Sequence, residues 1–340
     1  MYDVVSIGGA TRDIFIEATA EEVAWPRVPS GRAIALPLGS KAPVSALHFD
    51  VGGNALNASV TFARQGLKTA LCASVADDDG GRAVREILVK EGVATGALST
   101  GGRAATAHSF IMLRKGERAI LTYHGADGEL AVNDALLAKL RAKWWYISLP
   151  GATHRLLDKL LQHALRAGVK VALNPSGAHI ELDRSGLARA LKKVHFLVVN
   201  ESEASTIVGV PFEREKEVFK RLDEMVPGLV AVTSGKEGVR VSDGERLYRT
   251  AVFTNKRVVD RTGAGDAFGS GFLASLVRAG GECAKGACVP EAVCDAIRLG
   301  TANASSVVEY VGATKGALTA KAFEESARWR RLAVAIEKIA

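Results

Sequence analysis

The sequence predicts an α/β protein in which a central, mostly parallel β-sheet is covered by helices on both faces. The main observation is a regular alternation of short apolar runs with amphipathic helical stretches along the chain. Such alternation favours a parallel sheet, because each helix carries the chain back to the start of the next strand. In addition, no linker-like segment divides the 340 residues, and 48% of them are hydrophobic, which is enough to bury a sizeable core. We therefore expect a single domain over residues 1–340.

The predicted elements follow one another in order. Buried strands are expected at Val4–Ile7, Ala70–Val75, Trp144–Leu149, Val169–Leu173, Phe196–Val199 and Leu229–Val232. Helices are expected at Asn54–Gln65, Gly81–Glu91, His154–Ala167, Glu201–Gly209 and Glu213–Met225. In sheets of this kind, ligands bind at the carboxyl ends of the strands, so functional residues are expected there.

Two regions interrupt the alternation. Phe15–Val51 is long, contains four prolines and ends in a stretch of alternating polarity. Ala105–Tyr123 has two strand-like stretches on either side of the turn Arg114–Glu117, which is typical of a β-hairpin. Both regions are expected to lie outside the parallel sheet.

Charge and cysteine content argue against several functions. The net charge is +7, from 44 Lys and Arg against 37 Asp and Glu, and the excess is spread along the chain, so we expect a solvated surface and no nucleic-acid binding. No signal peptide or membrane span is recognisable, which predicts a cytoplasmic location and no membrane partner. Cys283, Cys288 and Cys294 lie close together but lack a Cys-x-x-Cys pair and a nearby His, so a metal role is disfavoured and the role of the cluster stays open.

The most informative segment is Asp260–Ser270. Gly263, Ala264 and Gly265 precede a helical stretch, where unpaired backbone N–H groups form an anion site. Asp266 follows at once, and a carboxylate beside a bound anion suggests chemistry: the amides would stabilise a moving phosphoryl group while Asp266 takes a proton from the attacking hydroxyl. The simpler alternative is a strand-to-helix turn capped by Asp266.

A second glycine turn precedes the helix predicted at Asn54–Gln65. Gly53 opens this turn, and Asn54 and Asn57 are three residues apart, so they project to one side of the first helical turn. Amide side chains both donate and accept hydrogen bonds, which suits a polyol, although two helix caps would also explain them.

Together these two segments resemble the signature regions of the ribokinase-like (PfkB) family of carbohydrate kinases. Family-like pieces also occur between them, at Asn174-Pro175, Asn200–Glu203 and Val232–Gly238, so that the resemblance extends from Val4 to about Leu318. It implies a ribokinase-like fold with a small β lid, formed here by about residues 15–51 and 104–124. Lids of this family often pair in dimers, so a homodimer through the lid is expected. The first lid segment is long for a simple sugar kinase.

The resemblance also assigns residues to ATP and metal ions. No Walker P-loop is present, because Gly235-Lys236 is followed by Glu237. Phosphate would be held by the Gly263–Gly265 turn together with Mg²⁺. Glu203 would organise the waters of this Mg²⁺. The alternative for Glu203 is that it only caps a helix together with Asn200. Asp260 would hold a monovalent cation such as K⁺, a role made less secure by Arg261. Residues implied at the nucleotide are Asn174, Asn200, Glu203, Thr233, Gly235 and Asn303.

On the acceptor side, Asp13 follows the first strand, where the family places an Asp that binds two sugar hydroxyls; a turn Asp is the alternative. We therefore expect an ATP-dependent kinase that phosphorylates a primary hydroxyl of a sugar. Asp266 would be the base, Gly263, Ala264 and Gly265 the anion hole, and Asp13, Gly53, Asn54 and Asn57 the acceptor ligands. One alternative is a nucleoside kinase whose base is surrounded by Phe15, Phe49, Phe110, Met112 and Tyr123. Another is a non-catalytic sugar-binding or regulatory protein, which the intact Asp266 disfavours.

Overall fold

The computed structural model describes residues 1–18, 20–28, 31–100, 102–114, 117–151, 154–254, 257–280 and 288–339. Its main sheet has the strand order β16-β15-β14-β13-β12-β11-β10-β1-β6-β7. The strands from β13 to β7 in this order run parallel, and β14, β15 and β16 are added antiparallel at one edge. The predicted mostly parallel sheet is therefore confirmed.

The strands of the main sheet are β1 (Tyr2–Gly8), β6 (Thr69–Val75), β7 (Ala94–Thr100), β10 (Ala142–Ser148), β11 (Lys170–Leu173), β12 (Phe196–Asn200), β13 (Leu229–Thr233), β14 (Val239–Ser242), β15 (Arg246–Thr250) and β16 (Ala335–Lys338). All six predicted strands are among them. The helices are α1 (Asn54–Arg64), α2 (Asp79–Lys90), α3 (Asp134–Lys139), α4 (His154–Ala167), α5 (Gly177–Leu182), α6 (Arg184–Leu191), α7 (Glu201–Val208), α8 (Glu215–Met225), α9 (Ala264–Arg278), α10 (Pro290–Val307), α11 (Ala320–Glu325) and α12 (Ala327–Arg330). Short 3₁₀ turns are η1 (Gly125–Glu129), η2 (Phe212–Arg214) and η3 (Gly235–Glu237).

Predicted helices and observed helices differ mainly at their starts. The last predicted helix begins at Glu215 rather than Glu213, because the backbone at Arg214 is non-helical (ψ 49°) and a 3₁₀ turn precedes it. The second begins earlier than predicted, at Asp79, because the Asp78 side chain accepts a hydrogen bond from the Gly81 N–H and caps it. These shifts leave the order of elements unchanged.

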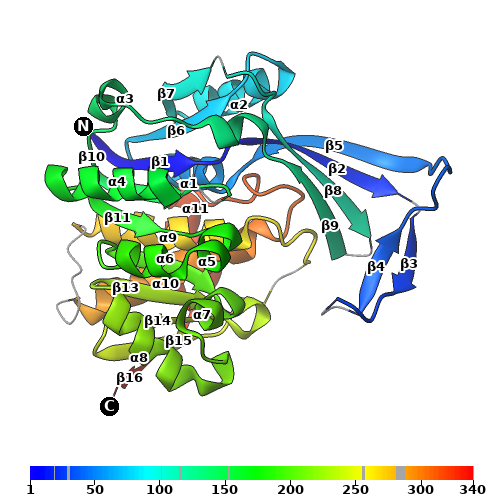
Figure 1. Ribbon diagram of the computed structural model, residues 1–340. Coiled ribbons are helices and arrows are strands. Elements are labelled where there is room, and N and C mark those ends of the chain that lie inside the picture. The colour runs from blue at the N-terminus through cyan, green and yellow to red at the C-terminus, as the bar shows by residue number, and fades with distance from the viewer. Residues whose placement is uncertain are drawn as a thin grey trace.

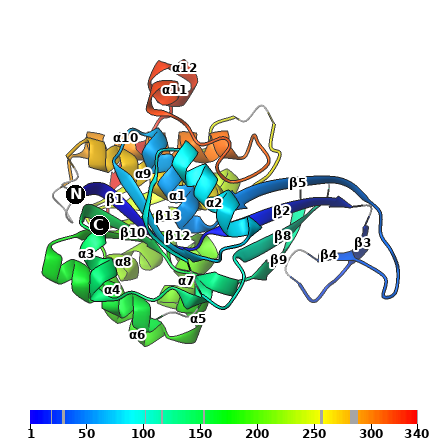
Figure 2. The same ribbon diagram turned by 90° about the horizontal axis from the view of Figure 1, so that it is seen from above.

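Helices pack on both faces of the main sheet (Figure 1, Figure 2). On β10 the side chains alternate between two cores: Trp145 and Ile147 pack with α4, α6, α7 and α8, whereas Trp144 and Tyr146 pack with α1, α9 and α10. Burial on both faces explains why these strands read as continuous apolar runs. Cys288 and Cys294 are buried in the second core, the latter within α10, and Cys283 lies outside the described residues.

The lid is a separate sheet that projects from one end of the body (Figure 1). Its order is β5 (Val44–Gly52), β2 (Thr11–Ala18), β8 (Ala107–Arg114) and β9 (Glu117–Tyr123). The antiparallel pairing of β8 with β9 confirms the predicted hairpin, whose turn residues Lys115 and Gly116 lie outside the described part of the chain. The length of the first lid segment is explained by an additional ribbon, β3 (Glu21–Ala24) paired with β4 (Arg32–Ala35).

Candidate active site

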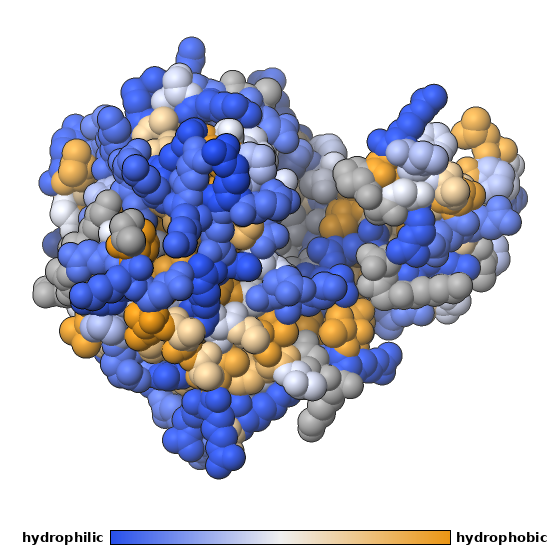
Figure 3. All heavy atoms as spheres, turned by 90° about the horizontal axis from the view of Figure 1, so that it is seen from below, coloured by the Kyte–Doolittle hydropathy of each residue, from blue (hydrophilic) through white to orange (hydrophobic). Residues whose placement is uncertain are grey.

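A cavity of about 300 Å³ lies between the lid and the carboxyl ends of the strands. The space-filling view from below shows a recess between the lid and the body (Figure 3). The residues that line the cavity are Gly9, Thr11, Asp13, Gly53, Asn54, Asn57, Ser109, Ile111, Ile120, Thr122, His124, Asp127, Ser148, Leu149, Pro150, Gly151, Ser176, Thr262, Gly263 and Asp266. The structure thus brings together Asp13, both asparagines of α1 and Asp266, which are far apart in the sequence.

The glycine turn before α9 has the geometry of an anion site. Gly263 is left-handed (φ 76°), and a Cβ on it would lie 2.4 Å from the Ala313 Cβ, so a larger residue would require neighbouring atoms to shift. At Gly265 an added Cβ would meet no atom of the described residues within 4 Å outside its own helix, so this side of the turn is open. Among the described side chains none caps α9, which leaves its first N–H groups available for an anion.

Asp260 fixes the loop that leads into this turn. Its carboxylate accepts hydrogen bonds from the Thr262 N–H (2.9 Å), the Thr262 hydroxyl (2.7 Å) and the Gly312 N–H (3.3 Å), and it is 2% exposed. These bonds give Asp260 a structural role. A monovalent cation at Asp260 stays a prediction.

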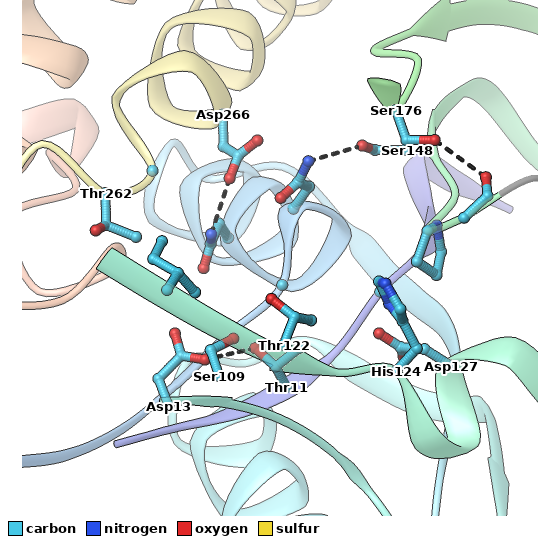
Figure 4. Close-up of a pocket in the computed structure, with 18 of the residues that line it drawn as sticks. Thr11, Asp13, Ser109, Thr122, His124, Asp127, Ser148, Ser176, Thr262 and Asp266 are labelled. Atoms are coloured by element: carbon cyan, nitrogen blue, oxygen red, sulfur yellow. Dashed lines mark hydrogen bonds between the residues drawn. The ribbon is translucent and has the colours of Figure 1, made fainter. Parts of the chain in front are cut away.

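Asp266 lies in the first turn of α9 and faces the cavity (Figure 4). Asn57 Nδ2 donates a hydrogen bond of 2.9 Å to Asp266 Oδ2, which orients the carboxylate. Burial raises the pKa of Asp266 to about 6, with the Asn57 hydrogen bond opposing the shift and the charge of Glu203 adding to it. The other Asn57 amide atom, Oδ1, is buried and has no hydrogen-bond partner among the described residues. It is available to a hydroxyl donor in the cavity.

Asp13 reaches the cavity from the lid strand β2. Thr11 Oγ1 donates a hydrogen bond of 2.7 Å to Asp13 Oδ1, and Ser109 also donates to this carboxylate. Burial raises the pKa of Asp13 to about 6 despite these bonds. A Cβ on Gly52 would lie 2.1 Å from Asp13 Oδ2, so β5 approaches the carboxylate closely only because Gly52 has no side chain.

A third group of polar residues joins α1 to the ends of β10 and β11. Asn54 Nδ2 donates to Ser148 Oγ (3.2 Å), and Ser148 Oγ donates to Asn174 Oδ1 (3.3 Å). Gly53, with φ 96°, lets the start of α1 lie against the loop after β1, because a Cβ on it would lie 2.5 Å from the Gly9 carbonyl oxygen. Asn174, expected at the nucleotide, is therefore hydrogen-bonded to the acceptor side of the site.

The other expected nucleotide residues lie on the neighbouring strand ends. Asn200 ends β12 and pairs in register with Thr233, which ends β13, and Gly235 follows in η3 with its surface exposed. Asn200 and Glu203 form a complete capping box: Glu203 N donates to Asn200 Oδ1 (2.9 Å), and Asn200 N donates to Glu203 Oε2 (2.8 Å). The capping alternative is thus present in the structure. Burial raises the pKa of Glu203, and its charge acts on Asp266, so it also lies near the reacting region.

Asn303 does not have the position that we expected for a nucleotide ligand. Its side chain is fully buried in α10, where Nδ2 donates to the Ala267 carbonyl oxygen (2.8 Å) and to Thr61 Oγ1 (3.2 Å), and Oδ1 accepts from the Leu318 N–H (2.8 Å). These contacts use its hydrogen-bonding groups to tie α1, α9 and α10 together. They give Asn303 a structural role, and a contact with the nucleotide stays a prediction.

The aromatic residues considered for a nucleoside base do not line the cavity. Side chains alternate along a strand, and on β8 and β9 it is Ser109, Ile111, Ile120 and Thr122 that face inward. Phe110, Met112 and Tyr123 take the opposite positions, and Phe49 is 59% exposed. Phe15 is fully buried and does not line the cavity either.

Several lining residues were missed from the sequence. Ser109 and Thr122 could have been found from strand alternation within the predicted hairpin. Ser176 follows the Asn174-Pro175 segment that we had singled out, and His124 follows the hairpin. Asp127, a buried carboxylate in η1, has no comparable sequence signal, because an Asp in a Gly-rich turn is usually solvated.

The carboxylates present fit Mg²⁺ that arrives with a nucleotide. Within the described ranges there is no group of three or more His, Cys, Asp or Glu side chains that could hold a metal ion. Magnesium at phosphate-transfer sites is bound by one or two carboxylates together with substrate phosphates and water, so it needs no such cage. Glu203, whose charge acts on Asp266, is the carboxylate suited to this.

The described helices also include none that is long and apolar enough to span a membrane.

Comparison with known proteins identifies the family. The chain matches the model of the pfkB family of carbohydrate kinases over residues 30–320. It is 28% identical to ribokinase of Haemophilus influenzae, over 77% of this chain and 82% of that protein. An uncharacterized sugar kinase of Archaeoglobus fulgidus is 30% identical over 75% of this chain and 97% of that protein. The structure of Arabidopsis thaliana ribokinase complexed with ribose and ATP has a TM-score of 0.76 at 22% identity, covering 94% of this chain and 97% of that one.

The chain therefore belongs to the pfkB family of carbohydrate kinases and has the ribokinase-like fold. The predicted family, fold class and enzyme class are confirmed, and the non-catalytic alternative is not retained.

Proposed function

We propose that the protein transfers the γ-phosphate of ATP to a primary hydroxyl of a sugar. The observation that carries this proposal is that Asp266, Asn57 and Asp13 line one cavity beside the open N-terminus of α9. The structure of the Arabidopsis relative holds ribose and ATP, and its fold is the same. None of the aromatic residues considered for stacking on a nucleoside base lines the cavity, which favours a sugar over a nucleoside.

Each residue has a defined proposed role. Asp266, oriented by Asn57, takes the proton from the attacking hydroxyl. The N–H groups at the Gly263–Gly265 turn bind the transferred phosphoryl group and stabilise its developing charge. Asp13 and the free amide oxygen of Asn57 accept hydrogen bonds from sugar hydroxyls. Glu203 would hold the waters of a Mg²⁺ ion, which would supply charge neutralisation at the nucleotide phosphates.

A substrate screen with a matched variant tests this proposal. ADP release is measured over pentoses, hexoses, sugar acids and nucleosides, for the wild type and for Asp266→Asn. We expect turnover of a sugar, and a fall in kcat of about 10² to 10⁴ in the variant with ATP affinity nearly unchanged, because the base is lost while its shape is kept. Near-normal kcat in Asp266→Asn would contradict the role of Asp266. Nucleosides turned over far faster than any sugar would contradict the acceptor class.

The melting temperature of the same variant shows whether it is folded. Because the folded pKa of Asp266 is about 6, above its usual 3.8, the folded chain binds this proton more tightly than the unfolded chain does. Stability contributed by the protonated group is present below pH 3.8 and is lost as the pH rises through 6. At pH 8 Asp266→Asn should therefore melt at or above the wild-type temperature. A lower melting temperature would mean that lost packing explains the lost activity.

We also propose a homodimer formed through the lid. Four apolar side chains are in register across its outer face, Phe49 on β5, Ile14 on β2, Phe110 on β8 and Leu121 on β9. Phe49 is 59% and Leu121 62% exposed, so this row is the apolar surface that a second copy would cover. A cytoplasmic location also stays a prediction.

A further inference from the structure

Asp127 is a buried carboxylate whose presence the proposed chemistry does not explain. It is 4% exposed, lines the cavity, and lies beside His124 and away from Asp266 in the close-up (Figure 4). Its backbone is fixed, because the Asp127 N–H donates to the His124 carbonyl oxygen (3.0 Å) and the Ala126 N–H donates to the Ala105 carbonyl oxygen (2.9 Å). The side chain is therefore held in place before any ligand arrives.

Only one of its two carboxylate oxygens accepts a hydrogen bond from the described residues. Oδ1 accepts a hydrogen bond of 3.0 Å from the Ala10 N–H, which joins η1 to the loop after β1. Oδ2 receives no hydrogen bond from the described residues, and it would lie only 2.9 Å from a Cβ at Gly9, another residue of the cavity wall. Burial raises the pKa of Asp127 to about 7, and the Ala10 bond only partly opposes this.

A structural role alone does not account for a carboxylate here. An asparagine would accept the same bond from Ala10 without the cost of burying a charge. Buried charges are normally retained where a partner neutralises them or where a ligand does so. No Lys or Arg occurs among the described residues that line the cavity, and within the described part of the chain no side-chain hydrogen bond or ion pair joins Asp127 to His124, so a ligand group is the remaining partner.

The charge of the whole cavity points the same way. Asp13, Asp127 and Asp266 lie on β2, η1 and α9, and His124 is the only basic side chain among the described lining residues. A carboxylate or phosphate on the acceptor would be buried near three carboxyl groups without a fixed cation to pair with it. Like charges brought together in a buried site repel strongly.

We propose that Asp127 is a specificity-determining residue whose Oδ2 accepts a hydrogen bond from a hydroxyl or ammonium group of the acceptor, so that the cavity takes uncharged and amino sugars and rejects carboxylated or phosphorylated ones. This inference rests on the proposed kinase function and specifies its acceptor. It assigns Asp127 a binding role, distinct from the proton transfer at Asp266.

The test compares acceptors that differ in charge. D-ribose, D-fructose and D-glucose are neutral, D-glucosamine carries an amine, and D-ribonate and D-gluconate carry a carboxylate. For each acceptor, kcat/KM and the dissociation constant are measured with the wild type, Asp127→Asn and Glu129→Gln. Asp127→Asn keeps an acceptor for the Ala10 N–H and removes the charge. Glu129→Gln removes a charge from the same 3₁₀ turn at a position that does not line the cavity.

In the wild type we expect the acids to be used at least tenfold less well than the best neutral or amino sugar. Asp127→Asn should lower kcat/KM for that sugar by about 10- to 100-fold, since a hydrogen bond to a charged group is lost, and should raise the acid-to-sugar ratio at least tenfold. The control Glu129→Gln should change neither the kcat/KM for that sugar nor the acid-to-sugar ratio. A melting curve shows that Asp127→Asn is folded.

Two results would overturn the role of Asp127. One is an acid-to-sugar ratio that Asp127→Asn leaves unchanged, which is the result that a purely structural residue would give. The other is a wild type that uses gluconate as well as glucose. Sugar binding without phosphorylation would instead overturn the proposed function, and the ratio of dissociation constants would then decide on Asp127. If none of the sugars binds, both proposals fail.

Discussion

At the scale of single residues, the site contains carboxyl groups that the fold makes costly to ionise. The pKa of Asp13 and that of Asp266 are raised to about 6, and that of Asp127 to about 7, in each case mainly by burial. All three titrate below or near neutral pH, so the proposed base is ionised under ordinary conditions. Burial therefore strengthens each group as a proton or hydrogen-bond acceptor without removing its charge at pH 8.

The proposed role of Glu203 in binding magnesium waters can be separated by experiment from its role as a helix cap. Glu203→Gln keeps an oxygen for the capping bond from the Asn200 N–H, because Gln serves in a capping box as Glu does. If the Glu203 charge holds magnesium waters, the variant should need about tenfold more Mg²⁺ for half-maximal rate. A magnesium titration of the initial rate measures this.

The same variant should also change the pH profile. The Glu203 charge contributes to the raised pKa of Asp266, so its removal should move the acidic limb of kcat to lower pH. Glu201→Gln is the control, since Glu201 lies in the same helical turn but pairs with Arg240 at 3.4 Å. An unchanged magnesium requirement and an unchanged pH profile would leave Glu203 as a cap alone.

At the scale of elements, the site depends on where α1 and α9 begin. Both helices start after a glycine with positive φ, Gly53 at 96° and Gly263 at 76°, and in both cases a Cβ would meet neighbouring atoms. These turns bring Asn57 and Asp266 within hydrogen-bond distance of each other. The start of each helix is therefore set by tertiary contacts as well as by local preference.

Gly263→Ala should impair the reaction through the shape of this turn. The substitution strains a left-handed backbone by about 1–2 kcal/mol and also places a Cβ against Ala313. Displacement of the anion-binding N–H groups should lower kcat by about tenfold or more. Steady-state kinetics and a melting curve measure the two effects.

Gly209→Ala is the matched control for backbone strain. Gly209 has a similar φ of 69° at the end of α7, and an added Cβ would meet no atom of the described residues within 4 Å. It should lose about 1–2 kcal/mol of stability from the backbone strain alone, less than Gly263→Ala, which also places a Cβ against Ala313, and it should keep its kcat. Full activity in Gly263→Ala, or an equal loss in both variants, would count against the anion-site assignment.

At the scale of the whole molecule, the lid has two different faces. Its inner face supplies Asp13, Ser109, Ile111 and Thr122 to the cavity, whereas its outer face carries the exposed row of apolar residues. The body is closed by two cores on opposite faces of the main sheet. A lid supported from only one side is the part of the molecule that a second copy would stabilise.

The outer face of the lid predicts a dimer that a single charge disrupts. Leu121→Lys places a positive charge in the apolar row, and it should shift the protein from dimer to monomer in size-exclusion chromatography with light scattering. Leu165→Lys, on α4 and 65% exposed, is the control and should remain dimeric. A monomeric wild type, or a dimer that Leu121→Lys leaves intact, would overturn the lid dimer.

The sequence by itself determined the alternating elements, the glycine turns and the residues of the two signature segments. These follow from local patterns: apolar runs buried on both faces of a strand, helical periodicity, and the need for glycine at positive φ. The six predicted strands, the hairpin and the position of Asp266 at a helix start were therefore accessible from single segments.

Only the tertiary structure decided what depends on distant neighbours. Asn303, Asp127 and Phe110 show this most clearly: the first is buried between helices, the second is enclosed beneath the lid, and the third faces outward because of strand register. In each case the side chain alone does not set its role, because burial and hydrogen-bond partners come from segments far away in the chain. The residues of the proposed phosphate transfer could be recognised in single segments, whereas the proposed selection of the acceptor depends on the assembled cavity.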